Sequence, residues 1–209
     1  MHQPHILKIS EIFVSIQGEG LRQGEATLFI RLSGCNLDCS FCDTRYAHEK
    51  GTEMSVGQIL DRVKLLRERV AAEWICLTGG EPLLQDIEKL ALGLKVERFK
   101  IQVETNGTIY RSLPVDWYTI SPKPDKYFYQ PEYLDKAKEV KLVVSKDLNY
   151  KTVQKIRREF PEKIPLLLQP ESNREWSMIK SFDLLKLAIN SEMKNIRISI
   201  QLHKIFRLQ

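Results

Sequence analysis

Three cysteines lie close together in one short stretch of the sequence. Cys35, Cys39 and Cys42 occur in the run Arg-Leu-Ser-Gly-Cys-Asn-Leu-Asp-Cys-Ser-Phe-Cys, with gaps of three and two residues between them. Three thiolates at this spacing can each bind one iron of a cubic [4Fe-4S] cluster and leave the fourth iron open. Because an open iron can bind a small molecule directly, this loop predicts cofactor chemistry.

A zinc site is the main alternative for these cysteines. Structural zinc takes four ligands, usually two Cys-x2-Cys pairs or one such pair with histidines. The second pair is missing here, so His48 would have to complete the set. Cys76, in Trp-Ile-Cys-Leu-Thr, has the surroundings of a buried strand residue and is not expected to be a fourth ligand. The pattern therefore favours a cluster over zinc.

Alternating strands and helices must position this loop. Helical periodicity follows Ser55, which is a good N-cap for a helix, and recurs in residues 149–160 and 175–190. The helix after Ser55 is expected to bury Val56, Ile59, Leu60, Val63 and Leu66. Strand-length apolar runs occur at Thr27–Leu32, Trp74–Thr78, Lys100–Glu104, Trp117–Ile120, Val140–Val144, Leu166–Gln169 and Ile196–Ile200. This alternation indicates an α/β fold with a mostly parallel sheet.

Polar or Gly/Pro-rich segments follow each of these strands. Examples are the cysteine loop, Gly79-Gly80-Glu81-Pro82 and Ser121-Pro122-Lys123. Such clusters at the carboxyl ends of parallel strands are how a (β/α) barrel builds its active site. The connections around 105–116 and 121–139 are short for full helices. We therefore expect an incomplete (β/α) barrel with an N-terminal hairpin extension, formed as a single domain over residues 1–209.

Composition sets the broad class. A chain of 209 residues with 43% hydrophobic content can bury one sizeable core. Without a secretory signal or an apolar run of about 20 residues, we expect a cytoplasmic protein that does not bind membranes. Residues 151–209 hold twelve Lys/Arg and six Asp/Glu. These basic residues are scattered, which favours solvated helix faces over a nucleic-acid surface.

The cysteine run resembles the hallmark of the radical S-adenosylmethionine (SAM) enzymes, with the aromatic Phe41 before the third cysteine. This resemblance implies a [4Fe-4S] cluster whose open iron binds SAM, and cleavage of SAM to methionine and a 5′-deoxyadenosyl radical. Gly79-Gly80-Glu81 matches the family's SAM-binding Gly-Gly-Glu motif. Ser121, Lys123 and Gln169 occupy positions where relatives contact SAM, although these matches are weaker.

The segment from Glu11 to Gly20, together with Arg31, resembles the 7-carboxy-7-deazaguanine synthase family. The likeness continues to the C-terminal Gln-Leu-His-Lys. It implies radical ring contraction of 6-carboxy-5,6,7,8-tetrahydropterin with loss of ammonia, on the route to queuosine, with SAM regenerated. It also implies a homodimer and an electron donor such as flavodoxin or ferredoxin.

The same resemblance assigns residue roles. Thr44, two residues after the third cysteine, would ligate Mg²⁺, which commonly keeps waters and takes substrate oxygens as ligands. Glu19 and Arg31 would be the catalytic residues. The substrate-binding set would be Gln17, Gly18, Glu19, Arg31, Thr78, His203 and Gln209, whose terminal carboxylate would meet the pterin.

Residue chemistry independently fits a carboxylated pterin. A carboxylate such as Glu19 and an amide such as Gln17 can bind the N–H donors and the carbonyl of an aminopyrimidinone ring. Arg31 can clamp a carboxylate with two parallel hydrogen bonds. The alternatives are structural: a hairpin turn for Gln-Gly-Glu-Gly, an ion pair of Arg31 with Asp38 or Asp43, and a cap for Thr44.

Two competing functions remain open at this point. A radical SAM activase of glycyl-radical enzymes would share the cysteines, but it would not need Gln17, Glu19 and Arg31 to bind a pterin. A zinc-stabilised nucleic-acid-binding module would use the basic C-terminal third. The metal content of the protein separates the second function from both enzymes.

Overall fold

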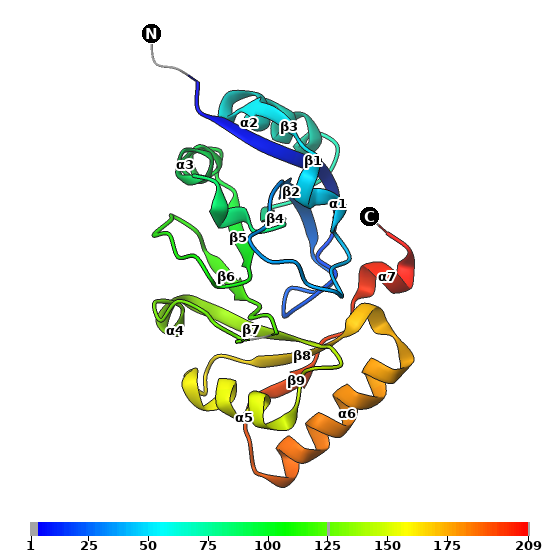
Figure 1. Ribbon diagram of the computed structural model, residues 1–209. Helices are drawn as coiled ribbons and strands as arrows, with labels where there is room; N and C mark the ends of the chain where they lie inside the picture. The colour runs from blue at the N-terminus through cyan, green and yellow to red at the C-terminus, as the bar shows by residue number, and fades with distance from the viewer. Residues whose placement is uncertain (1–3, 125, 209) are drawn as a thin grey trace. The chain divides into compact units, whose positions relative to one another are not determined.

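The computed structural model describes residues 4–124 and 126–208, which form two compact units (Figure 1). The first consists of Met1–Ile16, Glu25–Thr105 and Ile109–Trp117. The second consists of Gln17–Gly24, Asn106–Thr108 and Tyr118–Gln209. The prediction of a single radical SAM domain over residues 1–209 stays a prediction.

The first unit is built on five strands in the order β3-β1-β2-β4-β5. Strand β1 (Ile6–Ile16) runs antiparallel to both β2 (Ala26–Leu32) and β3 (Thr52–Ser55). Strands β4 (Trp74–Gly79) and β5 (Lys100–Thr105) continue parallel to β2. The antiparallel β1–β2 pair is the predicted N-terminal hairpin extension.

Two helices cover the sheet of this unit. Helix α2 (Val56–Arg67) begins after Ser55, whose side chain accepts a hydrogen bond from the backbone N–H of Gln58, while the Gln58 side chain accepts one from the backbone N–H of Ser55. Of the five residues predicted to be buried, Ile59 and Val63 are buried, whereas Val56, Leu60 and Leu66 are only partly buried because they flank the face that packs on the sheet. Helix α3 (Glu88–Val96) lies beside α2 and packs against β5 (Figure 1). The shorter elements are α1 (Tyr46–Glu49) and the 3-10 helix η1 (Pro82–Leu84).

The second unit continues the parallel pattern. Strands β6 (Trp117–Ile120), β7 (Ala137–Val144), β8 (Leu166–Pro170) and β9 (Ile196–Ile198) are neighbours in that order, and each pair is parallel. Helix α6 (Glu175–Asn190) packs against β8 and β9 and contacts α5 (Tyr150–Glu159) (Figure 1). The short elements are α4 (Tyr133–Lys136), the 3-10 helix η2 (Glu171–Asn173) and α7 (Leu202–Phe206).

The fold prediction is confirmed in class and architecture. The strands of the described residues are mostly parallel and alternate with helices, and their hydrogen-bonded order begins with β3 and ends with β9. Among the residues described in these segments, the 105–116 connection has no helix and the 121–139 connection has the single turn of α4, as their lengths indicate. None of the helices in the described part of the chain has both the length and the apolar character needed to cross a bilayer.

Candidate active site

The ends of β2 and β4 bring several predicted site residues to one edge of the first unit's sheet. In the parallel pairing of these strands, Arg31 is the register partner of Thr78, and Leu32 is the partner of Gly79. The cysteine loop follows β2 directly, and Gly80 and Glu81 follow β4 directly. Because both strands end at the same edge, the predicted SAM-binding turn and the cysteine loop emerge side by side.

The double-glycine turn packs against the cysteine loop through its backbone. Gly79 has a φ of 137°, and a Cβ there would overlap the carbonyl oxygen of Leu32. A Cβ on Gly80 would overlap the Gly34 carbonyl and approach Cys35. The Glu81 N–H donates to the Gly34 carbonyl oxygen at 2.8 Å. Only glycine allows this close approach, which leaves the backbone next to the first cysteine.

Exposure distinguishes the three cysteines of the loop from the fourth cysteine of the chain. Cys35, Cys39 and Cys42 are partly exposed, whereas Cys76 is buried in the core of β4, as predicted. Within the described residues, no three His, Cys, Asp or Glu side chains gather closely enough to hold one metal ion. A cubic cluster takes each thiolate on a different iron, so its three cysteines need not meet at one point.

The third cysteine has two polar neighbours. Its Sγ lies 3.7 Å from Thr44 Oγ1 and 3.6 Å from His48 Nε2. Thr44 thus lies beside the third cysteine of the loop. Its role as a Mg²⁺ ligand stays a prediction. Phe41 is partly buried next to Cys42.

Glu81 is fully buried and holds the turn in place. Its Oε1 accepts a hydrogen bond from the Leu83 N–H at 3.1 Å and one from Thr105 Oγ1 at 2.7 Å. These bonds cap η1 and tie the turn to the end of β5. The carboxylate therefore has a structural role in the turn, and its predicted contact with the SAM ammonium group stays a prediction.

Arg31 lies on the strand face that also carries Phe13. Its Nε is 3.7 Å from Glu11 Oε2, and its guanidinium carbon is 5.5 Å from the centre of the Phe13 ring. The buried Nε has no hydrogen-bond acceptor in the described part of the chain. Asp38, one of the alternative partners considered from the sequence, instead pairs with Arg45 at 2.9 Å. An unsatisfied buried donor favours a ligand at this position.

In the second unit, Glu19 is held by two residues that the sequence analysis did not single out. The Lys141 ammonium forms an ion pair with Glu19 Oε2, and Gln201 Nε2 donates to Glu19 Oε1 at 2.6 Å. Gln17 is buried, and its Oε1 accepts from the Glu19 N–H at 3.2 Å. A charged residue within the apolar run Val140–Val144 was the available signal for Lys141.

The ionisation of Glu19 follows from these contacts. Burial, the largest single influence, would raise the pKa of its carboxyl group. The charge of Lys141, hydrogen bonds from Lys141 and Gln201, and the charge of His203 act in the opposite direction and together lower the pKa to about 2. Glu19 is therefore a carboxylate at neutral pH and can only accept hydrogen bonds.

His203 joins the same group of residues. The Leu202 N–H donates to the Gly18 carbonyl oxygen at 2.9 Å. A Cβ on Gly18 would overlap the His203 ring, so the missing side chain leaves room for the imidazole. The structure thus brings together Gln17, Gly18, Glu19 and His203 from opposite ends of the chain. Gln209, which was also predicted to bind substrate, lies outside the described residues.

The three weaker candidates for SAM binding follow or end parallel strands of this unit. Ser121 follows β6, and its Oγ accepts from Lys123 Nζ at 2.7 Å. Gln169 lies in β8 with 4% of its surface exposed, and its Oε1 has no hydrogen-bond partner among the residues described. Both positions are compatible with ligand binding, which stays a prediction.

Comparison with known proteins identifies the family. The model of the radical SAM superfamily matches residues 29–175. Similar curated proteins include the 7-carboxy-7-deazaguanine synthases of Rickettsia prowazekii, 35% identical over 97% of this chain and 89% of that protein, and Aquifex aeolicus, 34% identical over 98% and 95%.

Solved structures agree with the sequence comparison. The crystal structure of QueE from Escherichia coli matches with a TM-score of 0.78 and 27% identity, covering 95% of each chain. Streptococcus suis SuiB, crystallised with S-adenosylmethionine, matches with a TM-score of 0.60 over 80% of this chain and 48% of its own; at 14% identity it supports the fold alone. The chain therefore belongs to the 7-carboxy-7-deazaguanine synthase family within the radical SAM superfamily.

Proposed function

We propose that this chain is a 7-carboxy-7-deazaguanine synthase, a lyase that converts 6-carboxy-5,6,7,8-tetrahydropterin to 7-carboxy-7-deazaguanine with loss of ammonia. The observation that carries this proposal is the match to curated synthases over 97–99% of the chain. The product belongs to the biosynthesis of queuosine and related 7-deazapurines. The ionised Glu19 and the unsatisfied Arg31 Nε support a substrate with N–H donors and a carboxylate.

The first unit carries the residues proposed for the cluster and part of those for SAM. Cys35, Cys39 and Cys42 would bind three irons of the [4Fe-4S] cluster. When bound, the cluster and SAM supply a 5′-deoxyadenosyl radical that can take a hydrogen atom from carbon. Gly79 and Gly80, whose backbone packs against the cysteine loop, would contact the methionine part of SAM. The remaining residues proposed for SAM are Phe41, Glu81, Ser121, Lys123 and Gln169.

Charge complementarity explains the proposed substrate contacts. Glu19, held as a carboxylate, accepts hydrogen bonds from the aminopyrimidinone N–H groups, and Gln17 and His203 adjoin it. Arg31 clamps the substrate carboxylate beside its register partner Thr78. Arg31 and Glu19 are the catalytic residues in this proposal, because fixed charges at the substrate stabilise the charge that develops during ring contraction.

Three further substrate, metal and redox assignments belong to the proposal. Thr44, beside Cys42 Sγ, would bind Mg²⁺ together with substrate oxygens and water. Gln209 would contribute the terminal carboxylate to the pterin. An electron donor such as flavodoxin or ferredoxin would reduce the cluster.

We also infer a cytoplasmic homodimer. None of the four cysteines forms a disulfide, which suits a reducing compartment. Helix α6 exposes Met178, Ile179 and Phe182, an apolar surface that a second copy of the chain would cover. The mass of the anaerobically purified protein in solution tests the dimer.

Substitution of the substrate-contacting residues tests the proposed reaction. In anaerobically reconstituted enzyme, Arg31→Ala and Glu19→Ala should each raise the KM for the carboxypterin by about 100-fold, because each removes charge-assisted hydrogen bonds. Arg62→Ala, an exposed arginine on α2, is the matched control and should leave the KM unchanged. Unaltered turnover of the carboxypterin by both site variants would refute the assignment and favour an activase.

Metal analysis tests the zinc-module alternative. After anaerobic purification the enzyme should be brown, with about four irons per chain. Colourless protein with about one zinc per chain would favour the binding module instead.

A further inference from the structure

Gln201, which the assignments above leave without a role, has both its backbone and its side chain fixed. It lies just before α7 and is 4% exposed. Its N–H donates to Asn173 Oδ1 at 3.0 Å, and its carbonyl oxygen accepts from Asn173 Nδ2 at 2.8 Å. At the other end of the side chain, Nε2 donates to Glu19 Oε1 at 2.6 Å. The amide therefore has one defined position.

The orientation of this amide follows from its partner. A carboxylate can only accept hydrogen bonds, so the end of the Gln201 amide that faces Glu19 must be the NH₂ group. The amide oxygen then points away from Glu19. This oxygen is buried and has no hydrogen-bond partner in the described part of the chain. A buried acceptor left unsatisfied by the protein favours a donor from a ligand.

Residues of strand β7 also hold Glu19 and its loop in place. Lys141 binds Glu19 Oε2, and Glu139, two residues earlier on the same face of β7, accepts from the Leu21 N–H at 2.7 Å. Thr119 Oγ1 donates to the other Glu139 oxygen, also at 2.7 Å. The 17–24 loop is thus attached to β7 at two points. Glu19 and the Gln201 oxygen form two fixed, buried acceptors linked by the Gln201 amide group.

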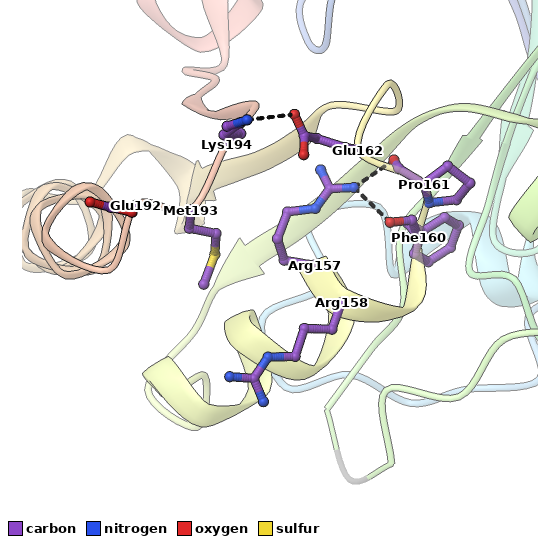
Figure 2. A pocket seen from close by; sticks show the side chains of 8 residues that line it. All are labelled: Arg157, Arg158, Phe160, Pro161, Glu162, Glu192, Met193 and Lys194. Carbon is purple, nitrogen blue, oxygen red and sulfur yellow. Dashed lines mark hydrogen bonds and ion pairs between the residues drawn. The ribbon is translucent and has the colours of Figure 1, made fainter.

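The pocket beside α5 contains a polar side chain, Arg157, whose hydrogen-bonding groups are satisfied by the protein itself. It has a volume of about 490 Å³ and contains Arg157 and Arg158 (Figure 2). Arg157 donates to the carbonyl oxygens of Ile164, Phe160 and Pro161 at 2.6, 2.9 and 2.6 Å. Its guanidinium group is therefore satisfied by the carbonyls that follow α5, so it caps the helix. Gln201 lacks such a partner at its oxygen.

The two acceptors match one side of the proposed substrate. An aminopyrimidinone ring presents an amino group next to a ring N–H, and two adjacent donors require two adjacent acceptors. We propose that Gln201 is a specificity-determining residue whose amide oxygen accepts a hydrogen bond from this edge of the substrate, next to Glu19, and that Lys141 is the positioning residue that fixes Glu19. This inference rests on the proposed function, because that function supplies the pterin.

Competition between two ligands tests the role of Gln201. The probes are 6-carboxypterin and 6-carboxylumazine, which replaces the exocyclic amino group by an oxygen. Binding is measured on the holoenzyme loaded with SAM and left unreduced, so that no turnover occurs. Wild-type protein should prefer the pterin, because the lumazine oxygen would face the Glu19 carboxylate and the Gln201 oxygen.

Gln201→Met should lower affinity for the pterin by about tenfold and leave the weak binding of the lumazine nearly unchanged. The preference for the pterin should therefore fall by the same factor. Gln23→Met is the matched control: Gln23 Nε2 donates to the carbonyl oxygens of Gly18 and Ile200 but does not touch Glu19. This control should keep the preference of the wild-type protein even if its thermal stability falls.

The isosteric Gln201→Glu separates the two ends of the amide. It keeps an oxygen facing the substrate, so the preference for the pterin should return. Its other oxygen meets Glu19, and the two carboxylates can share a proton only at acidic pH. Affinity relative to wild type should therefore fall as pH rises. The other charged or titratable groups facing Glu19 are Lys141 from β7 and His203 from α7, and both are common to wild type and variant.

The outcomes distinguish this inference from the proposed function. If Gln201→Met still prefers 6-carboxypterin over 6-carboxylumazine as strongly as wild type does, the proposed role of Gln201 is wrong and the proposed function stands. The same holds if the variant loses affinity for both ligands equally. Wild-type holoenzyme that binds neither compound would overturn the proposed function, and the inference with it. If Gln201→Met does not fold, Gln201→Asn withdraws the oxygen by one methylene and should show the same loss of preference.

Discussion

At the scale of single residues, ionisation is set by neighbours from distant parts of the chain. Burial alone would raise the pKa of Glu19, but Lys141, Gln201 and His203 lower it to about 2. Its folded-state pKa is thus below its ordinary value of 4.5. The ionised Glu19 therefore contributes stability that is fully present above about pH 4.5 and is lost as the pH falls toward 2.

Without Lys141, the buried Glu19 carboxylate should destabilise the fold at neutral pH. Lys141→Met leaves the Glu19 carboxylate buried without its counter-charge and should lower the free energy of unfolding by about 3 kcal/mol at pH 7. The difference from wild type should shrink as the pH falls toward 2. Burial raises the pKa of Glu19 in the variant, so its Glu19 is protonated first and the wild-type Glu19 follows only near pH 2. Urea denaturation of both proteins at several pH values measures this difference in the free energy of unfolding.

A lysine on the same strand provides the control for Lys141→Met. Lys138 is exposed on β7, and Lys138→Met should change stability by less than about 0.5 kcal/mol at every pH. A Lys141→Met defect that is equally large at pH 2 and pH 7 would mean that packing, and not the charge of Glu19, explains the loss.

Residues that act within one local motif could be predicted from the sequence, and residues that meet across the chain could not. The spacing of Cys35, Cys39 and Cys42 already contains the geometry of a cluster-binding loop. Gln201 lies 182 positions from Glu19, so no local pattern links them. The acidic neighbour of Arg31 was also out of reach, since Glu11 pairs with it across the hairpin and not within the loop.

At the scale of elements, apolar runs and caps predict the strands and helices that position the site. The helix over 175–190 and the helix after Ser55 are confirmed by α6 and α2. Strand β1 was expected only as part of the N-terminal hairpin, without bounds, and β3 was not predicted. Their apolar residues are interrupted by polar ones, and only pairing within the sheet makes them regular. Strand β9 ends at Ile198, two residues before the predicted end.

The turn after β4 should tolerate no side chain at its first glycine. Gly79→Ala combines a φ of 137° with a clash against the Leu32 carbonyl oxygen, and should lower the free energy of unfolding by about 3 kcal/mol. Because this turn adjoins the cysteine loop, iron content after reconstitution should fall as well. Chemical denaturation and iron analysis measure the two effects.

Gly24→Ala is the control for Gly79→Ala, because it introduces backbone strain without a steric clash. Gly24 has a φ of 92°, but a Cβ there has nothing within 4 Å. Its substitution should cost about 1 kcal/mol and leave iron content unchanged. If Gly79→Ala were no worse than Gly24→Ala, close packing of the turn against the cysteine loop would not matter for stability or for the cluster.

At the scale of the whole molecule, the proposed functions are distributed over both compact units. The first carries the cysteine loop, the double-glycine turn and Arg31; the second carries Glu19, Lys141 and Gln201. The sequence predicts the open, mostly parallel α/β architecture because strand and loop signals repeat along the whole chain. Some basic residues of the C-terminal third form ion pairs on the surface, such as Lys194 with Glu162 and Lys186 with Asp183.

The most direct test is turnover by the complete protein. Anaerobically reconstituted enzyme, given a reductant, SAM and 6-carboxy-5,6,7,8-tetrahydropterin, should form 7-carboxy-7-deazaguanine and ammonia in equal amounts. Both should exceed the SAM consumed, because SAM is regenerated in the proposed reaction. Product formation is followed by chromatography and ammonia by a coupled assay. A protein with an intact, reducible cluster that forms neither product would contradict the account.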